Sequence, residues 1–98
     1  MTELLAPSEV DAALIRRGLA WRRDGAVLVK TVNRGDFAGA LAYVNQVGEL
    51  AEEANHHPDV DIRWGVVVLR LATHSAGGLT ERDLSLAARI DALESAGS

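Results

Sequence analysis

Three histidines are the side chains of this sequence best suited to proton transfer near neutral pH. His56 and His57 are adjacent, and His74 follows later in the chain. An imidazole gains or loses its proton near pH 7, so such residues suit general acid–base catalysis. Glu52 lies four positions before His56, which places the two side chains on one face of a helix. We therefore expect the Glu52 carboxylate to support the His56 imidazole.

The expected strands bring the histidines to one end of a sheet. Residues 59–64 and 66–72 predict a hairpin that turns around Gly65. The outer ends of two antiparallel strands lie side by side, so His57 and His74 are expected to flank the same end. A functional site is predicted at this corner. For each histidine taken alone, a solvated or capping residue at a strand end stays open as the alternative.

Other chemistries fit the sequence less well. Three imidazoles and Glu52 could bind zinc, but adjacent histidines rarely ligate one ion with good geometry. The sequence also contains no pair of histidines four residues apart on a helix. No Ser or Thr lies in a nucleophile motif. Asp83 has two interpretations: a helix-terminal acid that stabilises the helix dipole, or a group that orients His74 across the Gly77-Gly78 turn.

Apolar periodicity predicts three helices and four strands. The helices are expected to begin at Ser8, to run from Asp36 to Asn55, and to follow Thr80; the strands are the two halves of residues 21–32, then residues 59–64 and 66–72. This α-β-β-α-β-β-α order indicates an α+β fold, a four-stranded antiparallel sheet with three helices packed on one face. The whole chain, residues 1–98, is expected to form one domain.

Several local features are predicted within these elements. Ser8 is expected to cap the first helix, and Asp24-Gly25 to supply the positive φ angles of a tight hairpin turn. Residues 66–72 are apolar enough to be a central strand. Trp21 and Trp64 are expected in the core. Thr80 and Asp83 resemble a capping box at the start of the last helix.

Composition limits the class of protein. The 98 residues are 48% hydrophobic with a formal charge of −4, and no basic run is present to coat a nucleic acid. The chain has no cysteine, so disulfides and thiolate metal sites are excluded. The first residues do not resemble a signal peptide, and no apolar run reaches the ~20 residues of a membrane span. A small soluble cytoplasmic domain is expected, and its small core favours oligomerisation.

The residues singled out above resemble the signature of the pterin-4a-carbinolamine dehydratase family. The resemblance rests on Glu52-x-x-x-His56-His57-Pro58, on the spacing to His74, and on the segment from Gly78 to Asp83 that enters the last helix. It covers nearly the whole chain. It implies dehydration of 4a-hydroxytetrahydropterin to quinonoid dihydropterin, a step that recycles the cofactor of aromatic amino-acid hydroxylases.

The resemblance also implies roles for individual residues. His56 and His74 would be the acid–base groups, while His57, the third catalytic residue, would chiefly bind and orient the pterin. The implied substrate-binding set is Asn55, His56, His57, Pro58, Thr73, His74 and Ser75, with Glu52 and Asp83 supporting the imidazoles. No metal and no cofactor are implied. Many members carry an aromatic residue where this chain has Val60, so pterin binding is expected to be weaker unless Trp64 compensates.

The resemblance implies partners as well. A homodimer or homotetramer is expected, because family members pair sheets edge to edge and pack their long helices between dimers. An aromatic amino-acid hydroxylase would share the pathway, and no direct contact with nucleic acid or membrane is expected. Relatives in animals also serve as dimerisation cofactors of a transcription factor. A non-enzymatic binding role is therefore the alternative.

Overall fold

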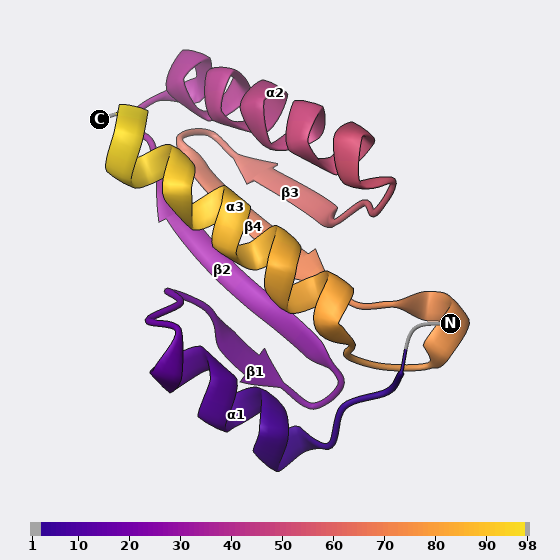
Figure 1. The fold of residues 1–98 in the computed structure, drawn as a ribbon. Helices are drawn as coiled ribbons and strands as arrows, with labels where there is room; N and C mark the ends of the chain where they lie inside the picture. The colour runs from indigo at the N-terminus through magenta and orange to yellow at the C-terminus, as the bar shows by residue number, and fades with distance from the viewer. Residues whose placement is uncertain (1–2, 98) are drawn as a thin grey trace.

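The computed structural model describes residues 3–97, which form three α-helices, four strands and one short 3-10 helix (Figure 1). In chain order the elements are α1 (Pro7–Arg16), β1 (Arg22–Asp24), β2 (Val27–Asn33), α2 (Phe37–Ala54), β3 (Asp59–Arg63), β4 (Val66–Leu71), η1 (His74–Ala76) and α3 (Glu81–Gly97). The predicted α+β order is confirmed.

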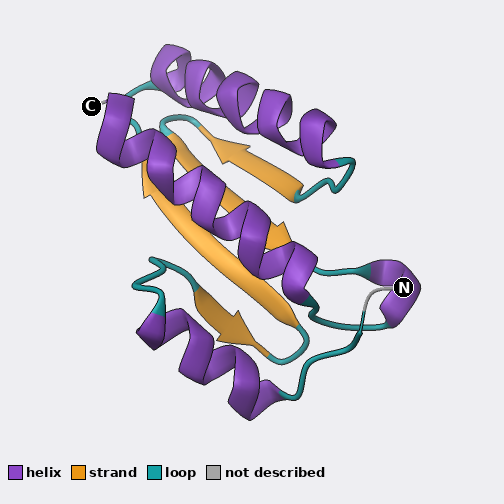
Figure 2. Cartoon of the chain, in the orientation of Figure 1, coloured by secondary structure: helices purple, strands orange, loops and turns teal. Residues whose placement is uncertain are grey.

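The four strands form one antiparallel sheet in the order β1-β2-β4-β3 (Figure 2). Leu28 pairs with Leu71 where β2 meets β4, and Ile62 pairs with Val67 where β3 meets β4. α3 crosses the middle of the sheet, while α2 lies along the β3 side and α1 along the β1 side (Figure 1). The prediction that residues 66–72 form a central strand is correct, since β4 has a neighbour on each side.

The core lies between the helices and the sheet. Val67, Leu69 and Leu71 alternate along β4 and are fully buried, whereas Arg70 on the other face is exposed. Burial of each such side chain stabilises the fold by roughly 1.5–3 kcal/mol. The helices contribute further buried residues, among them Val10, Tyr43, Val47, Leu84, Leu86 and Ile90.

Both ends of α2 follow from local sequence, and its predicted extent is confirmed. Asp36 caps the first turn, where its carboxylate accepts a 2.8 Å hydrogen bond from the Gly39 N–H. Asn55 ends the helix in the left-handed conformation, with φ at +49°. The left-handed residue turns the chain sharply just before His56 and His57, so the helix end decides where the two imidazoles point.

Two local predictions are wrong. Ser8 does not cap α1: the helix begins at Pro7 after Ala6, whose N–H donates to Glu9 Oε1 at 2.7 Å. Proline is well suited to this first position because it has no N–H to satisfy. In the first hairpin, Asp24 is already in β1, paired with Val27. Gly25 alone supplies the positive φ of the turn, at +62°.

The two tryptophans have different environments. Trp21 is buried, as predicted, and its indole N–H donates to Asp91 Oδ1 at 2.9 Å. The core position predicted for Trp64 is wrong, since this residue is 70% exposed. Trp64 occupies the β3–β4 turn with φ at +50°, beside Gly65. A Cβ on Gly65 would lie 2.8 Å from the Asp36 nitrogen, so the turn abuts the start of α2 and the indole is directed outward.

Candidate active site

The segments that carry the three histidines lie at one end of the sheet. His56 and His57 join α2 to β3, and His74 begins η1 just after β4. Asp59 of β3 pairs with Arg70 of β4, so the start of β3 and the end of β4 lie side by side. The connection between α2 and β3 and the segment that contains η1 extend from this same end of the sheet (Figure 1).

His56 forms a buried pair with Asp83. The His56 Nε2 lies 2.6 Å from Asp83 Oδ1, and the two side chains are 8% and 0% exposed. Asp83 comes from the first turn of α3, whereas His56 follows α2, so the pair joins two helices. Half of the predicted capping box is present, since the Thr80 N–H donates to Asp83 Oδ2 at 2.9 Å, whereas the Thr80 hydroxyl accepts from the Arg82 N–H at 3.2 Å. The role predicted for Asp83 as the orienter of His74 is wrong, because its imidazole partner is His56.

His57 faces a different carboxylate. Its Nε2 is hydrogen-bonded to Glu52 Oε2, and the two side chains are 55% and 78% exposed. The predicted support of His56 by Glu52 is therefore wrong. Adjacent residues point in different directions after the left-handed turn at Asn55, which leaves His57, rather than His56, against the last turns of α2. Each imidazole of the pair thus has a carboxylate of its own.

The hydrogen bonds assign the protons of His56. An ionised carboxylate only accepts hydrogen bonds, so the His56 Nε2 carries a proton and donates it to Asp83. The His56 Nδ1 has no hydrogen-bond partner among residues 3–97. Within that range no buried side-chain nitrogen or oxygen lacks a partner, so Nδ1 must reach the solvent-accessible surface. Nδ1 is therefore the ring atom that His56 can offer to a ligand.

Different histidines line the two hollows at this corner. His56 lines a pocket of about 260 Å³ between the end of α2 and the start of α3, together with Arg82 and Arg89. His57 and Glu52 line an open hollow along α2. His74 is exposed on η1 and lines neither hollow. The structure thus brings the three histidines to one corner, where His56 and His57 line different hollows.

The remaining predicted binding residues differ in accessibility. Asn55 and Ser75 are exposed, and Pro58 is half-buried. Thr73 is buried, and its hydroxyl donates to Asp83 Oδ2 at 2.8 Å. That hydroxyl faces the interior, so it is not exposed to a ligand as the implied binding role would require. Trp64 cannot compensate for Val60 at this site, because Trp64 follows the far end of β3, about 17 Å away for a strand of five residues.

Arg82 is a site residue that sequence reasoning missed. Its guanidinium donates to the Asn55 backbone carbonyl at 2.6 Å, which ties α3 to the turn just before His56. A partly exposed arginine near a helix start gives no sequence signal for such a contact. Among residues 3–97, no group of three or more His, Cys, Asp or Glu side chains is arranged to hold a metal ion.

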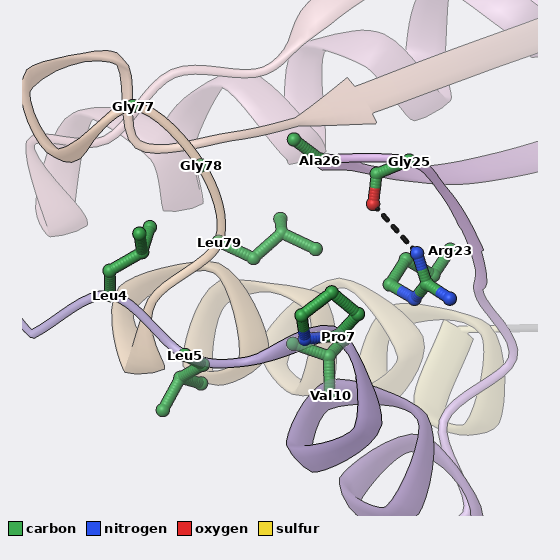
Figure 3. A pocket seen from close by; sticks show the side chains of 10 residues that line it. All are labelled: Leu4, Leu5, Pro7, Val10, Arg23, Gly25, Ala26, Gly77, Gly78 and Leu79. Carbon is green, nitrogen blue, oxygen red and sulfur yellow. Dashed lines mark hydrogen bonds between the residues drawn. The ribbon is translucent and has the colours of Figure 1, made fainter.

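An apolar pocket of about 240 Å³ lies beside the turn of the first hairpin and contains none of the histidines (Figure 3). Leu4, Leu79 and Ala26 line it, with the Arg23 side chain at its edge. Asp11 and the Gly25 carbonyl already engage the Arg23 guanidinium, at 2.7–3.0 Å. This pocket therefore presents apolar surface and no free charge.

No helix within residues 3–97 is long and apolar enough to cross a lipid bilayer.

Comparison with known sequences gives one consistent family. Residues 3–93 match the model of the family described as "Pterin 4 alpha carbinolamine dehydratase". Two similar curated proteins, from Nocardia farcinica and Thermomicrobium roseum, are each named "Putative pterin-4-alpha-carbinolamine dehydratase". The first is 50% identical over 94% of this chain and 96% of its own, and the second is 50% identical over 86% and 90%.

Solved structures agree in fold. A structure titled as a transcriptional coactivator/pterin dehydratase from Brucella melitensis superimposes with a TM-score of 0.84 at 31% identity, over 93% of this chain and 98% of the other. A pterin dehydratase-like protein, described as a RuBisCO assembly factor in the alpha-carboxysome, has a TM-score of 0.64 at 32% identity, over 81% and 92%.

Proposed function

Because the chain belongs to the pterin-4a-carbinolamine dehydratase family, we propose that it dehydrates 4a-hydroxytetrahydropterin to quinonoid dihydropterin and water. The match over residues 3–93 carries this proposal, since it includes the three histidines together with Glu52 and Asp83. In the proposed pathway the product returns to the pterin cofactor of an aromatic amino-acid hydroxylase. The 50% identity of two curated relatives that bear the dehydratase name supports it.

The reaction requires two proton transfers. The bond between C4a and its hydroxyl oxygen breaks, and a proton added to that oxygen lets it leave as water. The proton on N5 departs to a base, and its electron pair forms the C4a=N5 double bond. No electrons are gained or lost overall, so the step needs no redox cofactor. An acid and a base with proton affinities near neutrality suit both transfers.

In this proposal His56 and His74 perform the proton transfers. Asp83 fixes His56 with its Nε2 protonated, which leaves Nδ1 to exchange a proton with the substrate. His74 is exposed at the same end of the sheet and free to act as the second group. His57, held by Glu52 on the surface, would bind and orient the pterin ring.

The test is formation of quinonoid dihydropterin by purified protein in a coupled hydroxylase assay. His74→Ala should abolish most of the rate, while Ser8→Ala on the exposed first turn of α1 should retain it. Exhaustive chelation should leave the rate unchanged, because His56 and His57 each face their own carboxylate and do not converge on one point. A wild-type protein that does not accelerate the reaction would disprove the proposal.

A binding role is the second candidate function. Two similar structures carry titles that name a transcriptional coactivator and a RuBisCO assembly factor. This chain also exposes apolar side chains on α2, where Phe37 is 50% and Leu41 41% exposed. A protein that acts only by binding would lose its function on Leu41→Glu and keep it on His74→Ala, whereas a dehydratase would show loss with His74→Ala.

We also propose that the chain forms a homodimer or homotetramer. The outer edge of β3 has no strand partner within residues 3–97, and an open edge favours pairing. Gly39 of α2 has a packing role inside the chain, since a Cβ there would lie 2.4 Å from the Arg34 carbonyl oxygen. Light scattering should give a mass above 10.4 kDa. Leu41→Glu should lower that mass, and Ile15→Glu, also on an exposed helix face, should not.

A further inference from the structure

A ladder of hydroxyl groups links the segment of His74 to the buried His56–Asp83 pair. Thr73 and Thr80 lie with their Oγ1 atoms 2.7 Å apart, and both are buried. Thr73 Oγ1 also lies 2.8 Å from Asp83 Oδ2, the carboxylate whose other oxygen binds His56. Thr73 immediately precedes His74 in the chain. Thr73 thus connects the segment that carries His74 to the carboxylate that binds His56.

The direction of each hydrogen bond in the ladder can be assigned. A hydroxyl has one proton to donate, and the Asp83 carboxylate can only accept, so Thr73 donates to Asp83. The proton between the two threonines must then come from Thr80, whose oxygen in turn accepts from the Arg82 N–H at 3.2 Å. Each hydrogen bond therefore has one assigned donor, and the donated protons run from Arg82 through Thr80 and Thr73 to Asp83. Such a network holds its members in one arrangement.

The backbone of Thr73 transmits this arrangement to His74. The Thr73 N–H donates to the Gly78 carbonyl at 2.9 Å, and the Thr73 carbonyl accepts from the N–H groups of Ala76 and Gly77, each at 3.0 Å. These bonds close the loop that carries His74, which itself is exposed. The position of Thr73 therefore sets where the loop, and with it His74, lies relative to α3.

We propose that Thr73 is a positioning residue, whose buried hydroxyl holds the His74 loop and the His56–Asp83 pair in register, and not a residue that touches the substrate. The proposal rests on the proposed function for its catalytic consequence. A displacement of about 1 Å in a catalytic group can lower a rate ~100-fold. Loss of the hydroxyl should therefore lower kcat, while the exposed surface that binds substrate is preserved.

Two substitutions separate the hydroxyl from the shape of the side chain. Thr73→Val keeps the shape and removes the hydroxyl, whereas Thr73→Ser keeps the hydroxyl and removes a methyl group. We expect Thr73→Val to lower kcat about 10- to 100-fold with little change in KM, and Thr73→Ser to stay near wild type. Thr31→Val makes the same chemical change at an exposed position of β2 and should have no effect. A Val variant more active than the Ser variant would show a packing role and overturn the proposal.

A second measurement does not depend on activity. The chain has three histidines, so their imidazole signals can be assigned by nuclear magnetic resonance from single substitutions. Thr73→Val should shift the His56 signal, although Thr73 and His56 are remote in sequence, and should leave that of His57 unchanged. If Thr73→Val does not fold, His56→Ala tests the same link from its other end and should shift the His74 signal. If the substitutions leave the histidine signals unmoved, the link between Thr73 and His56 is refuted. If the signals shift but the wild-type protein is inactive, only the dehydratase function is refuted.

Discussion

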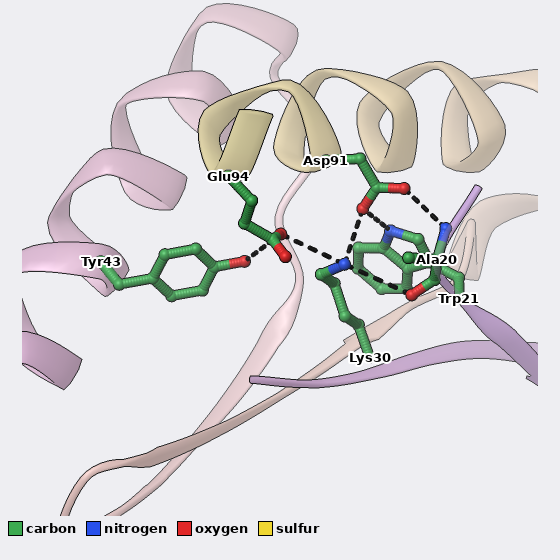
Figure 4. A network of polar contacts seen from close by, with 6 residues as sticks. All are labelled: Ala20, Trp21, Lys30, Tyr43, Asp91 and Glu94. Atoms are coloured by element: carbon green, nitrogen blue, oxygen red, sulfur yellow. Dashed lines mark hydrogen bonds and ion pairs between the residues drawn. The ribbon is translucent and has the colours of Figure 1, made fainter. Parts of the chain in front are cut away.

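Lys30 of β2 and Asp91 of α3 form an ion pair 2.8 Å long between the sheet and the helix that crosses it (Figure 4). The Lys30 side chain is 4% exposed, and its ammonium group also lies 3.1 Å from Glu94. Asp91 further accepts hydrogen bonds from the Trp21 indole and the Ala20 N–H. The centre of the sheet therefore contains a charged network in addition to its apolar core.

Replacement of Lys30 by Met should destabilise the protein strongly. The change removes the cation that pairs with Asp91, whose side chain is 18% exposed, so the loss should approach but not reach the value of about 3–5 kcal/mol for a fully buried pair. Chemical denaturation would measure the loss in unfolding free energy. Arg63→Met is the matched control, since Arg63 pairs with Asp61 on the surface at 79% exposure and should change stability by under ~1 kcal/mol. Equal effects of the two substitutions would contradict the prediction.

Tyr43 should make the fold sensitive to alkali. Burial, and then the nearby charge of Glu94, raise the pKa of Tyr43 well above its usual range. The unfolded chain releases this proton near pH 10 while the folded chain keeps it, so stability is intact below about pH 10 and falls as the pH rises further.

Tyr43→Phe should flatten that alkaline decline. At neutral pH it should cost about 1 kcal/mol for the lost 3.3 Å hydrogen bond to Glu94. Tyr43 is the only tyrosine of the chain, so tyrosinate absorbance reports its ionisation directly. Ionisation of the folded protein near pH 10 would show that the pKa is not raised.

Replacement of either proposed acid–base group should lower kcat more than it raises KM. His56→Ala and His74→Ala should each reduce kcat by about 10²–10⁴-fold, the usual contribution of a positioned proton-transfer group. The double variant should lose less than the product of the two single effects if the groups act together. Circular dichroism should confirm an intact fold. Full kcat in His74→Ala would remove His74 from the mechanism.

Changes in the exposed His57–Glu52 pair should affect substrate binding more than kcat. His57→Ala should raise KM strongly, because a contact that orients the ring also binds the ground state. Since Glu52 contacts His57, Glu52→Gln should reproduce a weaker form of the same change. Glu53→Gln, one position along the helix, removes a carboxylate that pairs with Arg89 and should leave KM unaltered. An effect of Glu52→Gln confined to kcat would reassign Glu52 to the chemistry.

Sequence periodicity predicted the elements because each has a strong local signal. Asp36 and Asn55 mark the ends of α2, and the apolar run of residues 66–72 indicates a central strand. The pairing of carboxylates with histidines could not be predicted in the same way. Spacing along an ideal helix places Glu52 beside His56, but the left-handed Asn55 ends the helix first and leaves His57 there instead.

The partners of Asp83 and Lys30 depend on how α3 crosses the sheet, and no local pattern encodes that crossing. Asp83 has the same sequence signature whether it only caps α3 or also binds His56. Lys30 lies on the same face of β2 as Leu28 and Val32, and its acids lie on an element far along the chain. Local sequence patterns therefore could not predict these contacts between distant segments.

All proposed site residues fall within residues 52–83, a continuous part of the chain, while α1 and β1 contribute none. The ion pair Arg17–Glu81 joins the end of α1 to α3, whereas Arg23–Asp11 joins β1 to α1. We expect α1 and β1 to open more often than β4, because β1 has a strand neighbour on one side only. The amide hydrogens of α1 and β1 would then exchange with solvent sooner than those of β4, and the proposed site would stay folded during such local opening.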